Sequence, residues 1–293
     1  MPVHNTQSKV TLNHPKGPSA EILLYGATVT SWKAASPASD GSFPTERLFV
    51  SSKAALDGSK PVRGGIPVVF PCFGAPEHPE HVKLSQHGFA RNSVWAFDSV
   101  VMDNDAGVSV RFTLQPDASI AAVYARSFEL AYVVTLAEHQ LSTDLHVTNP
   151  ASSPLEFQAL LHTYIRAPAN DVTISALAGK FYIDKTDPDP AAKNTLKEEK
   201  REKVDVRRFT DAIYENAPSK VHVIWPGGGL EVRMTEFKTL TVWNPQAQAG
   251  SKIGDMEEGG WERYVCVEPG YVRGFKKLEA GKTWIGQQVL TVL

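Results

Sequence analysis

The chain has 293 residues, and all-β sandwiches and barrels can reach roughly 200 to 250 residues as one domain. Lysine and arginine total 30 and aspartate and glutamate total 32, so the formal net charge is −2, which argues against a protein that binds nucleic acid or a membrane surface through basic excess. Cys72 and Cys266 are the only cysteines, which excludes a disulfide scaffold and a four-cysteine zinc site.

The segment Met1–Val10 is polar and lacks the apolar region of a signal peptide. No apolar stretch approaches the roughly 18 residues of a membrane-spanning helix. We therefore expect a soluble cytoplasmic protein in which both cysteines are buried free thiols. The near-neutral charge is compatible with a monomer.

In the first half of the chain, β-rich runs predict strands over Glu21–Trp32, Arg47–Ser51, Val94–Met102 and Val108–Leu114. The segment Asp117–Arg126 then predicts a short helix. From Ser127 to Ala137 every even position from Phe128 to Leu136 is apolar, and Leu141–Val147 alternates in the same way after a turn at Glu138 and His139. These two runs predict a β-hairpin with one solvent-exposed face.

Strands are also predicted over Leu155–Tyr164, Val221–Trp225, Leu230–Met234, Thr239–Trp243, Arg263–Glu268 and Trp284–Leu293. The charged segment Asn194–Lys203 is interpreted as a surface helix or a loop. No ten-residue helix alternates with the strands, which argues against a parallel α/β fold. We expect an all-β protein with one domain over residues 1–293.

Two residues suggest acid–base chemistry. Within Leu155–Tyr164, His162 shares its face of the strand with Glu156 and Gln158, a pattern that suits a concave sheet facing a polar ligand. Glu268 is followed by Pro269-Gly270, which predicts a turn directly after the carboxylate. A structural histidine and a surface glutamate remain the alternatives.

Two glycine-containing segments carry arginines. Pro61–Pro71 contains Gly64-Gly65 and predicts a rigid edge segment that projects Arg63 into a site. Gln86–Arg91 again combines polar groups with a glycine. Because the guanidinium fork suits phosphate, Arg63 and Arg91 suggest an anionic substrate; structural pairing with carboxylates is the alternative.

Six motifs in order resemble the hexose-6-phosphate mutarotases (glucose-6-phosphate 1-epimerases) of the aldose 1-epimerase, or galactose mutarotase-like, superfamily. The motifs are Arg63-Gly64-Gly65-Ile66-Pro67, His87-Gly88-Phe89-Ala90-Arg91, Leu161-His162-Thr163-Tyr164, Thr210-Asp211-Ala212-Ile213-Tyr214, Trp243-Asn244-Pro245 and Cys266-Val267-Glu268-Pro269. The resemblance implies a β-supersandwich of two large antiparallel sheets with a substrate cleft on a concave face.

The resemblance also assigns roles to individual residues. It implies that His162 and Glu268 are the catalytic pair, and that Arg63, Gln86, Arg91 and Asp211 bind substrate. The implied activity is the interconversion of α and β anomers of a hexose 6-phosphate, with no metal and no cofactor.

Three positions qualify the resemblance. Cys72 stands where a glutamine is expected and Gln246 where many relatives carry tryptophan, and both could alter the wall of the pocket. Asp205 is the alternative to Asp211. The alternative functions are a mutarotase of unphosphorylated aldoses, a glycoside hydrolase using Asp211 and Glu268, and a non-catalytic carbohydrate-binding protein.

Overall fold

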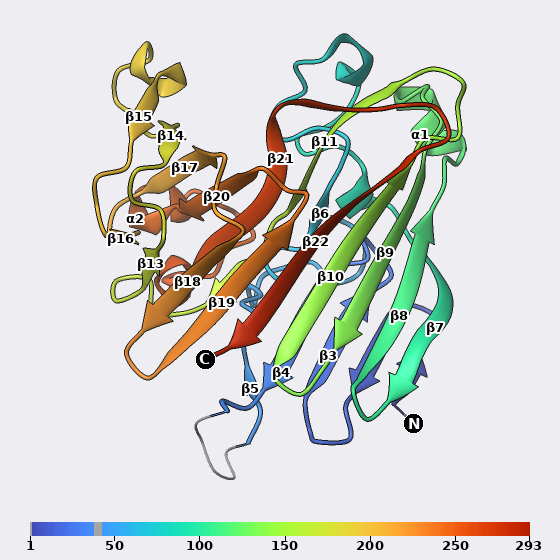
Figure 1. Ribbon diagram of the computed structural model, residues 1–293, viewed down its shortest axis with the longest axis horizontal. Coiled ribbons are helices and arrows are strands. Elements are labelled where there is room, and N and C mark those ends of the chain that lie inside the picture. The colour runs from blue at the N-terminus through green and yellow to red at the C-terminus, as the bar shows by residue number, and fades with distance from the viewer. Residues whose placement is uncertain (1, 38–42) are drawn as a thin grey trace.

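The computed structural model describes residues 2–37 and 43–293, and antiparallel strands dominate it (Figure 1). The largest sheet has nine strands, of which β18, β19, β22, β10, β9, β8 and β7 lie side by side across the view in Figure 1. In spatial order they are β16 (Lys203–Asp205), β13 (Thr173–Ser175), β18 (Lys220–Trp225), β19 (Gly228–Thr235), β22 (Thr283–Val292), β10 (Gln140–Thr148), β9 (Glu129–Leu136), β8 (Gly107–Leu114) and β7 (Ala96–Asn104).

A second sheet has eight strands. Its order is β15 (Leu196–Glu198), β14 (Phe181–Asp184), β17 (Thr210–Glu215), β20 (Thr239–Asn244), β21 (Tyr264–Leu278), β11 (Leu155–Leu161) and β6 (Val68–Val69), and β12 (Tyr164–Arg166) also pairs with β21. The prediction of two large antiparallel sheets is confirmed.

A third sheet of five strands, which the sequence analysis did not separate, comes from the N-terminal part of the chain. It contains β1 (Val3–Asn5), β2 (Lys9–Asn13), β3 (Ser19–Leu23), β4 (Val29–Ala34) and β5 (Thr45–Glu46). The α-helices of the described residues are α1 (Ala118–Val123) and α2 (Gln246–Gly250), and short 3₁₀ turns occur at Pro79–His81, Ala90–Asn92, Ala192–Asn194 and Gly260–Arg263. None of the helices in residues 2–37 and 43–293 has the length and apolar character of a membrane span.

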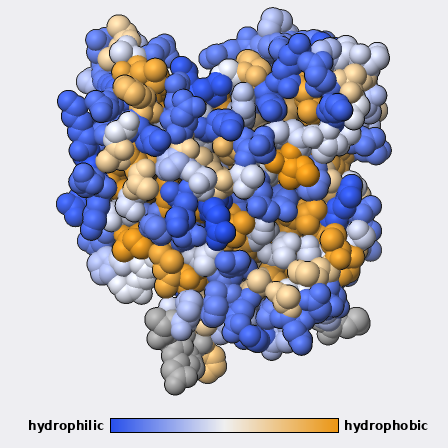
Figure 2. Space-filling view, in the orientation of Figure 1, coloured by the Kyte–Doolittle hydropathy of each residue, from blue (hydrophilic) through white to orange (hydrophobic). Residues whose placement is uncertain are grey.

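The alternating pattern on β9 and β10 produces the predicted hairpin. Leu136 lies opposite Leu141, and the Ala137 N–H donates to the Gln140 carbonyl across the turn. The even-numbered side chains of β9 are buried between the sheets, while the face of the molecule shown in Figure 2 is mainly hydrophilic with small separate apolar groups. One apolar cluster includes buried residues from all three sheets.

Four sequence predictions are corrected. The run Arg47–Ser51 does not form a strand, since it makes only isolated bridges at Leu48 and Val50. The run Glu21–Trp32 forms two strands, β3 and β4, because the chain turns at Gly26-Ala27 with positive φ at both residues. The segment Asn194–Lys203, interpreted as a surface helix or a loop, forms no α-helix: Asn194 ends a 3₁₀ turn, and a loop connects β15 to the start of β16, two edge strands on which exposed charges are common.

The turn predicted after Glu268 is also wrong. Strand β21 continues through Pro269 to Leu278, with Pro269 opposite Leu240 and Gly270 opposite Leu160. A proline removes one ladder donor, and the pairs on either side of it hold the strand together. Glu268 therefore lies within a long central strand, held by neighbours on both sides.

Candidate active site

Successive side chains of strand β21 point alternately to the core and to the opposite face of the sheet. Val265 and Val267 face the core between the sheets, whereas Cys266 and Glu268 face the opposite side. Both Cys266 and Glu268 are nonetheless buried, with exposed fractions of 0% and 1%. The strand thus carries a carboxylate into the floor of a cleft.

The pairing of β20 with β21, and of β17 with β20, places the other side chains of this floor. On β20, Thr241 lies opposite Glu268 and Trp243 lies opposite Cys266. On the next strand, β17, Asp211 lies opposite Trp243. Directly paired residues in an antiparallel sheet point to the same face, so the three neighbouring strands present these side chains together.

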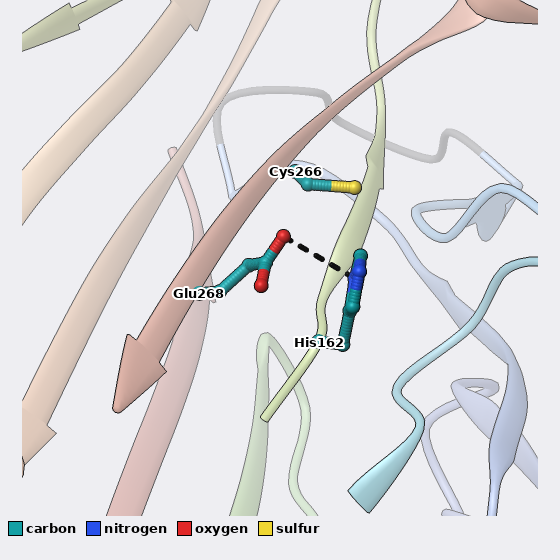
Figure 3. Close-up of side chains that lie close together, drawn as sticks. All are labelled: His162, Cys266 and Glu268. Atoms are coloured by element: carbon teal, nitrogen blue, oxygen red, sulfur yellow. Dashed lines mark ion pairs between the residues drawn. The ribbon is translucent and has the colours of Figure 1, made fainter. Parts of the chain in front are cut away.

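His162 follows the end of β11 and reaches the same floor. Its backbone N–H donates to the Pro67 carbonyl at 3.0 Å, and its ring stacks on Tyr164 with a centroid separation of 4.8 Å. The ring also meets Trp243 edge-on. Nδ1 of His162 lies 3.3 Å from Oε1 of Glu268, without the geometry of a hydrogen bond (Figure 3).

The segment that contains Arg63 runs beside His162, as an edge of the sheet, in agreement with the sequence prediction. A Cβ on Gly65, whose φ is +67°, would lie 2.2 Å from the Val29 carbonyl oxygen, so this close approach requires glycine. The Arg63 guanidinium donates to Asp255 Oδ1 at 3.0 Å and to the Tyr164 hydroxyl at 3.4 Å. Arg63 is thus both paired with a carboxylate and part of the cleft lining.

The predicted segment Gln86–Arg91 forms another wall. His87 and Gly88 both have positive φ, and the His87 Nδ1 accepts a hydrogen bond from the Gly74 N–H at 3.1 Å. Gln86 and His87 line the cleft. Arg91 lies behind them, where its Nη2 donates to the Gln86 carbonyl at 2.9 Å.

The cleft has a volume of about 140 Å³. Five of the six predicted site residues line it, namely Arg63, Gln86, His162, Asp211 and Glu268; the other lining residues are Phe73, Gly74, His87, Lys185, Thr241 and Trp243. Arg91 is absent from this lining. Asp205, the alternative to Asp211, lies on an edge strand where its carboxylate accepts the Arg207 N–H.

Lys185 is the site residue that the sequence analysis missed entirely. It follows β14, its N–H donates to the Asp211 carbonyl at 2.8 Å, and its ammonium lies 5.4 Å from the centre of the Phe73 ring. No local pattern marks this lysine, because all its neighbours in the cleft are distant in sequence. His87, by contrast, lies within the motif His87-Gly88-Phe89-Ala90-Arg91.

The two departures from the resembling family lie outside the cleft wall. Cys72 is buried, with its Sγ 4.0 Å from the Ser85 carbonyl oxygen, and burial raises the pKa of its thiol to about 11. The Gln246 side chain donates to the Val206 carbonyl. Neither residue contributes to the lining of the cleft.

Burial shifts the pKa values of His162 and Glu268 in opposite directions. The pKa of Glu268 lies well above its ordinary value because of burial, with a further increase from the nearby Asp211 and a partial decrease from Lys185. The pKa of His162 lies well below its ordinary value because of burial and then His87, Arg91 and Arg63. Two adjacent groups perturbed in this way are typical of a site for proton transfer.

Comparison with known proteins assigns the chain to a family. The family model described as aldose 1-epimerase matches residues 8–291. The chain belongs to the aldose 1-epimerase family. Among curated proteins, it is 30% identical over 298 residues to a candidate glucose-6-phosphate 1-epimerase from Cenchrus ciliaris, a match covering 97% of this chain and 84% of the relative. A candidate glucose-6-phosphate 1-epimerase from Escherichia coli K12 is 28% identical over 280 residues, covering 93% and 86% of the two chains.

Solved structures of aldose 1-epimerase relatives confirm the fold. A candidate mutarotase from Salmonella typhimurium superposes with a TM-score of 0.84 at 23% identity, over 99% of this chain and 92% of that one. A galactose 1-epimerase from Lactobacillus acidophilus superposes with a TM-score of 0.72 at 15% identity, over 97% and 94%. The galactose mutarotase-like architecture expected from the sequence is therefore correct.

Proposed function

We propose that this member of the aldose 1-epimerase family interconverts the α and β anomers of hexose 6-phosphates, chiefly glucose 6-phosphate. The observation that carries the proposal is the buried pair of His162 and Glu268 on the floor of a cleft that Arg63 and Lys185 also line. The names of the curated relatives support the same substrate class.

Anomer exchange needs one base and one acid. Glu268 removes the proton of the C1 hydroxyl while His162 delivers a proton to the ring oxygen, so the bond between C1 and the ring oxygen breaks and a C1 carbonyl forms. Rotation about C1–C2 turns the other carbonyl face toward the C5 hydroxyl. Closure then reverses the two roles and restores both protons.

The pKa shifts make each group reactive in its proposed role, but they favour the proton on Glu268 over His162 in the free site. A carboxylate whose pKa is raised is a stronger base, and an imidazolium whose pKa is lowered is a stronger acid. The pair must hold one proton in total, and the proposed cycle begins with that proton on His162. A bound phosphate would favour this state, because it offsets the positive charges that oppose protonation of His162.

Several groups could hold the phosphosugar. Arg63 lines the cleft, and Arg91 lies one layer behind it with a buried Nε that has no hydrogen-bond partner among the described residues. We propose that these two arginines bind the phosphate together with Lys185. Gln86 and Asp211 offer an amide and a carboxylate to the sugar hydroxyls.

The cleft beside His162 and Glu268 has a volume of about 140 Å³, and a cavity of about 490 Å³ shares Phe73 and Lys185 with it. The cations Arg63 and Lys185 in the lining of the cleft favour a phosphosugar over the neutral sugar chain of a glycoside hydrolase. A mutarotase of unphosphorylated aldoses is the second candidate. Arg63 already forms an ion pair with Asp255, which leaves fewer of its donors for a phosphate.

The test is NMR exchange spectroscopy of glucose 6-phosphate at anomeric equilibrium, with glucose and galactose measured in parallel. We expect acceleration of glucose 6-phosphate above the spontaneous rate and little acceleration of the free sugars. Acceleration of the free sugars alone would retain the acid–base pair and reject the phosphate site. The absence of acceleration with all three sugars would favour a carbohydrate-binding protein.

We further propose that the protein acts in the cytoplasm as a monomer. Both cysteines are free and buried, as is usual in a reducing compartment. Sedimentation velocity would test the oligomeric state.

A further inference from the structure

Three potential metal ligands converge beside the proposed acid–base pair. The imidazole of His162, the thiol of Cys266 and the carboxylate of Glu268 offer ligand atoms that all lie within 4.8 Å of one another. Figure 3 shows why: Cys266 and Glu268 extend from one face of β21, and the His162 ring lies opposite both. The cysteine has no part in the proposed anomer exchange.

The nitrogen and oxygen atoms of this cluster that face one another lack hydrogen-bond partners among the described residues. Both carboxylate oxygens of Glu268 and Nδ1 of His162 are buried without a hydrogen bond in the part of the chain that the structure describes. Glu268 is 1% exposed. A buried carboxylate with no hydrogen bond is costly, so the site gains from a ligand that satisfies it.

We propose that His162, Cys266 and Glu268 form a binding site for a thiophilic divalent cation of the Zn²⁺ type, and that the bound ion inhibits the enzyme. One nitrogen, one sulfur and one oxygen donor match the ligands that Zn²⁺ takes in proteins. Bond lengths of about 2.0 to 2.3 Å place tetrahedral ligand atoms about 3.5 Å apart, so small rotations of these side chains suffice. The fourth position would open toward the cleft.

The charges of the cleft are compatible with this ion. Arg63 and Lys185 would repel an uncompensated cation, but a thiolate and a carboxylate together neutralise a divalent ion. On coordination, the proton of the Cys266 thiol and any proton on Glu268 pass to the solvent, and His162 donates a ring lone pair. Because both groups of the acid–base pair are then occupied, proton exchange with a sugar stops.

Metal binding can be tested without any activity. Co²⁺ titrated into the full-length protein should produce a thiolate-to-cobalt absorption band that saturates at one ion per chain. We expect Cys266→Ser, and Cys266→Ala as a second variant, to remove this band. The matched control is Cys72→Ser, which changes the other buried cysteine outside the cleft. The proposal is overturned if the wild-type protein shows no such band, or if Cys72→Ser removes it.

Inhibition is tested on glucose 6-phosphate exchange, with each variant compared with its own metal-free rate. The inhibitory role rests on the proposed function, whereas the cobalt band does not, so the two can fail separately. We expect Zn²⁺ to inhibit reversibly, chelation by EDTA to restore the rate, and Mg²⁺ to have no effect because it prefers oxygen ligands.

The cysteine variants locate the inhibition. Cys266→Ser should need at least about 10-fold more Zn²⁺ for half-inhibition, since even loss of an outer contact to a metal ligand weakens binding about 10- to 100-fold. Thermal unfolding would confirm that the variant is folded. Equal sensitivity of Cys266→Ser and the wild type, or acceleration by Zn²⁺, would refute the inhibitory site.

Discussion

At the scale of single residues, His162 and Glu268 lie close together and have pKa values that are shifted in opposite directions. Their nearest polar atoms are 3.3 Å apart, and a positioned proton-transfer group typically contributes about 10² to 10⁴ in rate. We expect His162→Ala and Glu268→Gln each to lose at least this factor in glucose 6-phosphate exchange measured by NMR. Circular dichroism would show that both remain folded, and near-wild-type rates in both would reject the pair.

The burial of Glu268 also predicts a dependence of stability on pH. Its pKa in the folded protein is raised above the unfolded value of 4.5, so the folded state binds more protons than the unfolded state above that pH. This contribution to stability is present at low pH and is lost as the pH rises through the folded pKa. Glu268→Gln removes the titration while keeping the shape.

We therefore expect Glu268→Gln to gain stability relative to the wild type as the pH rises from about 5 to about 8, by on the order of 1 kcal/mol or more. Urea unfolding at several pH values measures this gain. Glu258→Gln is the control, because its side chain is exposed and should show little change. A constant difference across the pH range would contradict the shift.

Lys185 offers a cleaner test of phosphate binding than Arg63, which also pairs with Asp255. A hydrogen bond to a charged group contributes about 1.5 to 3 kcal/mol, which corresponds to a loss of roughly 10- to 150-fold in affinity. We expect Lys185→Gln to raise KM for glucose 6-phosphate by such a factor. Lys193→Gln, in the neighbouring cavity, should have a small effect. Equal changes for glucose and glucose 6-phosphate would exclude a phosphate contact.

Which site residues could be predicted depended on the range of their contacts. Alternation singled out His162, and adjacent glycines singled out the segment of Arg63, because both signals are local. Gln86 and Asp211 came only from the family resemblance. Lys185 has no local signal, since its place in the cleft depends on where β14 meets β17. Pairing of Arg63 with a carboxylate was one of the alternatives, but its partner Asp255 lies 192 positions away and has no local signal.

At the scale of elements, the strands with one buried face were the easiest to predict. Strands β9 and β10 alternate cleanly because one side of each packs in the core. Apolar alternation was uninformative at β15, an edge strand with little apolar burial. The turn signal was misleading at Pro269, where pairing with two neighbouring strands continues the strand despite the proline. Local propensity was thus overruled by neighbours that the sequence does not reveal.

The loop around His87 depends on one glycine. Gly88 has φ +72°, and a Cβ there would lie 2.1 Å from the Phe70 carbonyl oxygen. Gly74 has the same φ, but a Cβ there would meet no atom within 4 Å. Both substitutions by alanine incur the cost of a left-handed conformation, about 1 kcal/mol or more, and Gly88→Ala adds a clash with the backbone.

We expect Gly88→Ala to destabilise the protein by at least about 1 to 3 kcal/mol more than Gly74→Ala. Urea unfolding would give the difference. Similar values for the two variants would show that the Phe70 backbone can move aside and that the loop is less constrained than its packing indicates.

At the scale of the whole molecule, the family resemblance predicted the two large sheets but not the third. The N-terminal strands share one apolar cluster with the others, and the pairing of strands into separate sheets depends on long-range register. The shared cluster supports the expectation of a single domain. Phe157 on β11 illustrates it, since its ring lies 5.5 Å from that of Trp284 on β22 in the other large sheet.

We expect Phe157→Ala to lower the free energy of unfolding by about 3 to 5 kcal/mol within one cooperative transition. Circular dichroism and tryptophan fluorescence should report the same midpoint. Phe181→Ala, at a side chain that is 52% exposed, should change it little. Two transitions, of which only one moves, would indicate more than one domain.

The place of β22 has a consequence for how the molecule forms. This strand follows all other described strands in the sequence, yet it lies inside the nine-stranded sheet between β19 and β10. During synthesis, therefore, β10 and β19 each have an edge with unpaired backbone groups until β22 emerges. Such edges are templates for wrong pairing. The hydroxyl of Thr163, next to His162, donates to Gln288 on this strand at 2.8 Å. The floor of the proposed active site thus receives its support from the opposite sheet only when the latest strand is in place.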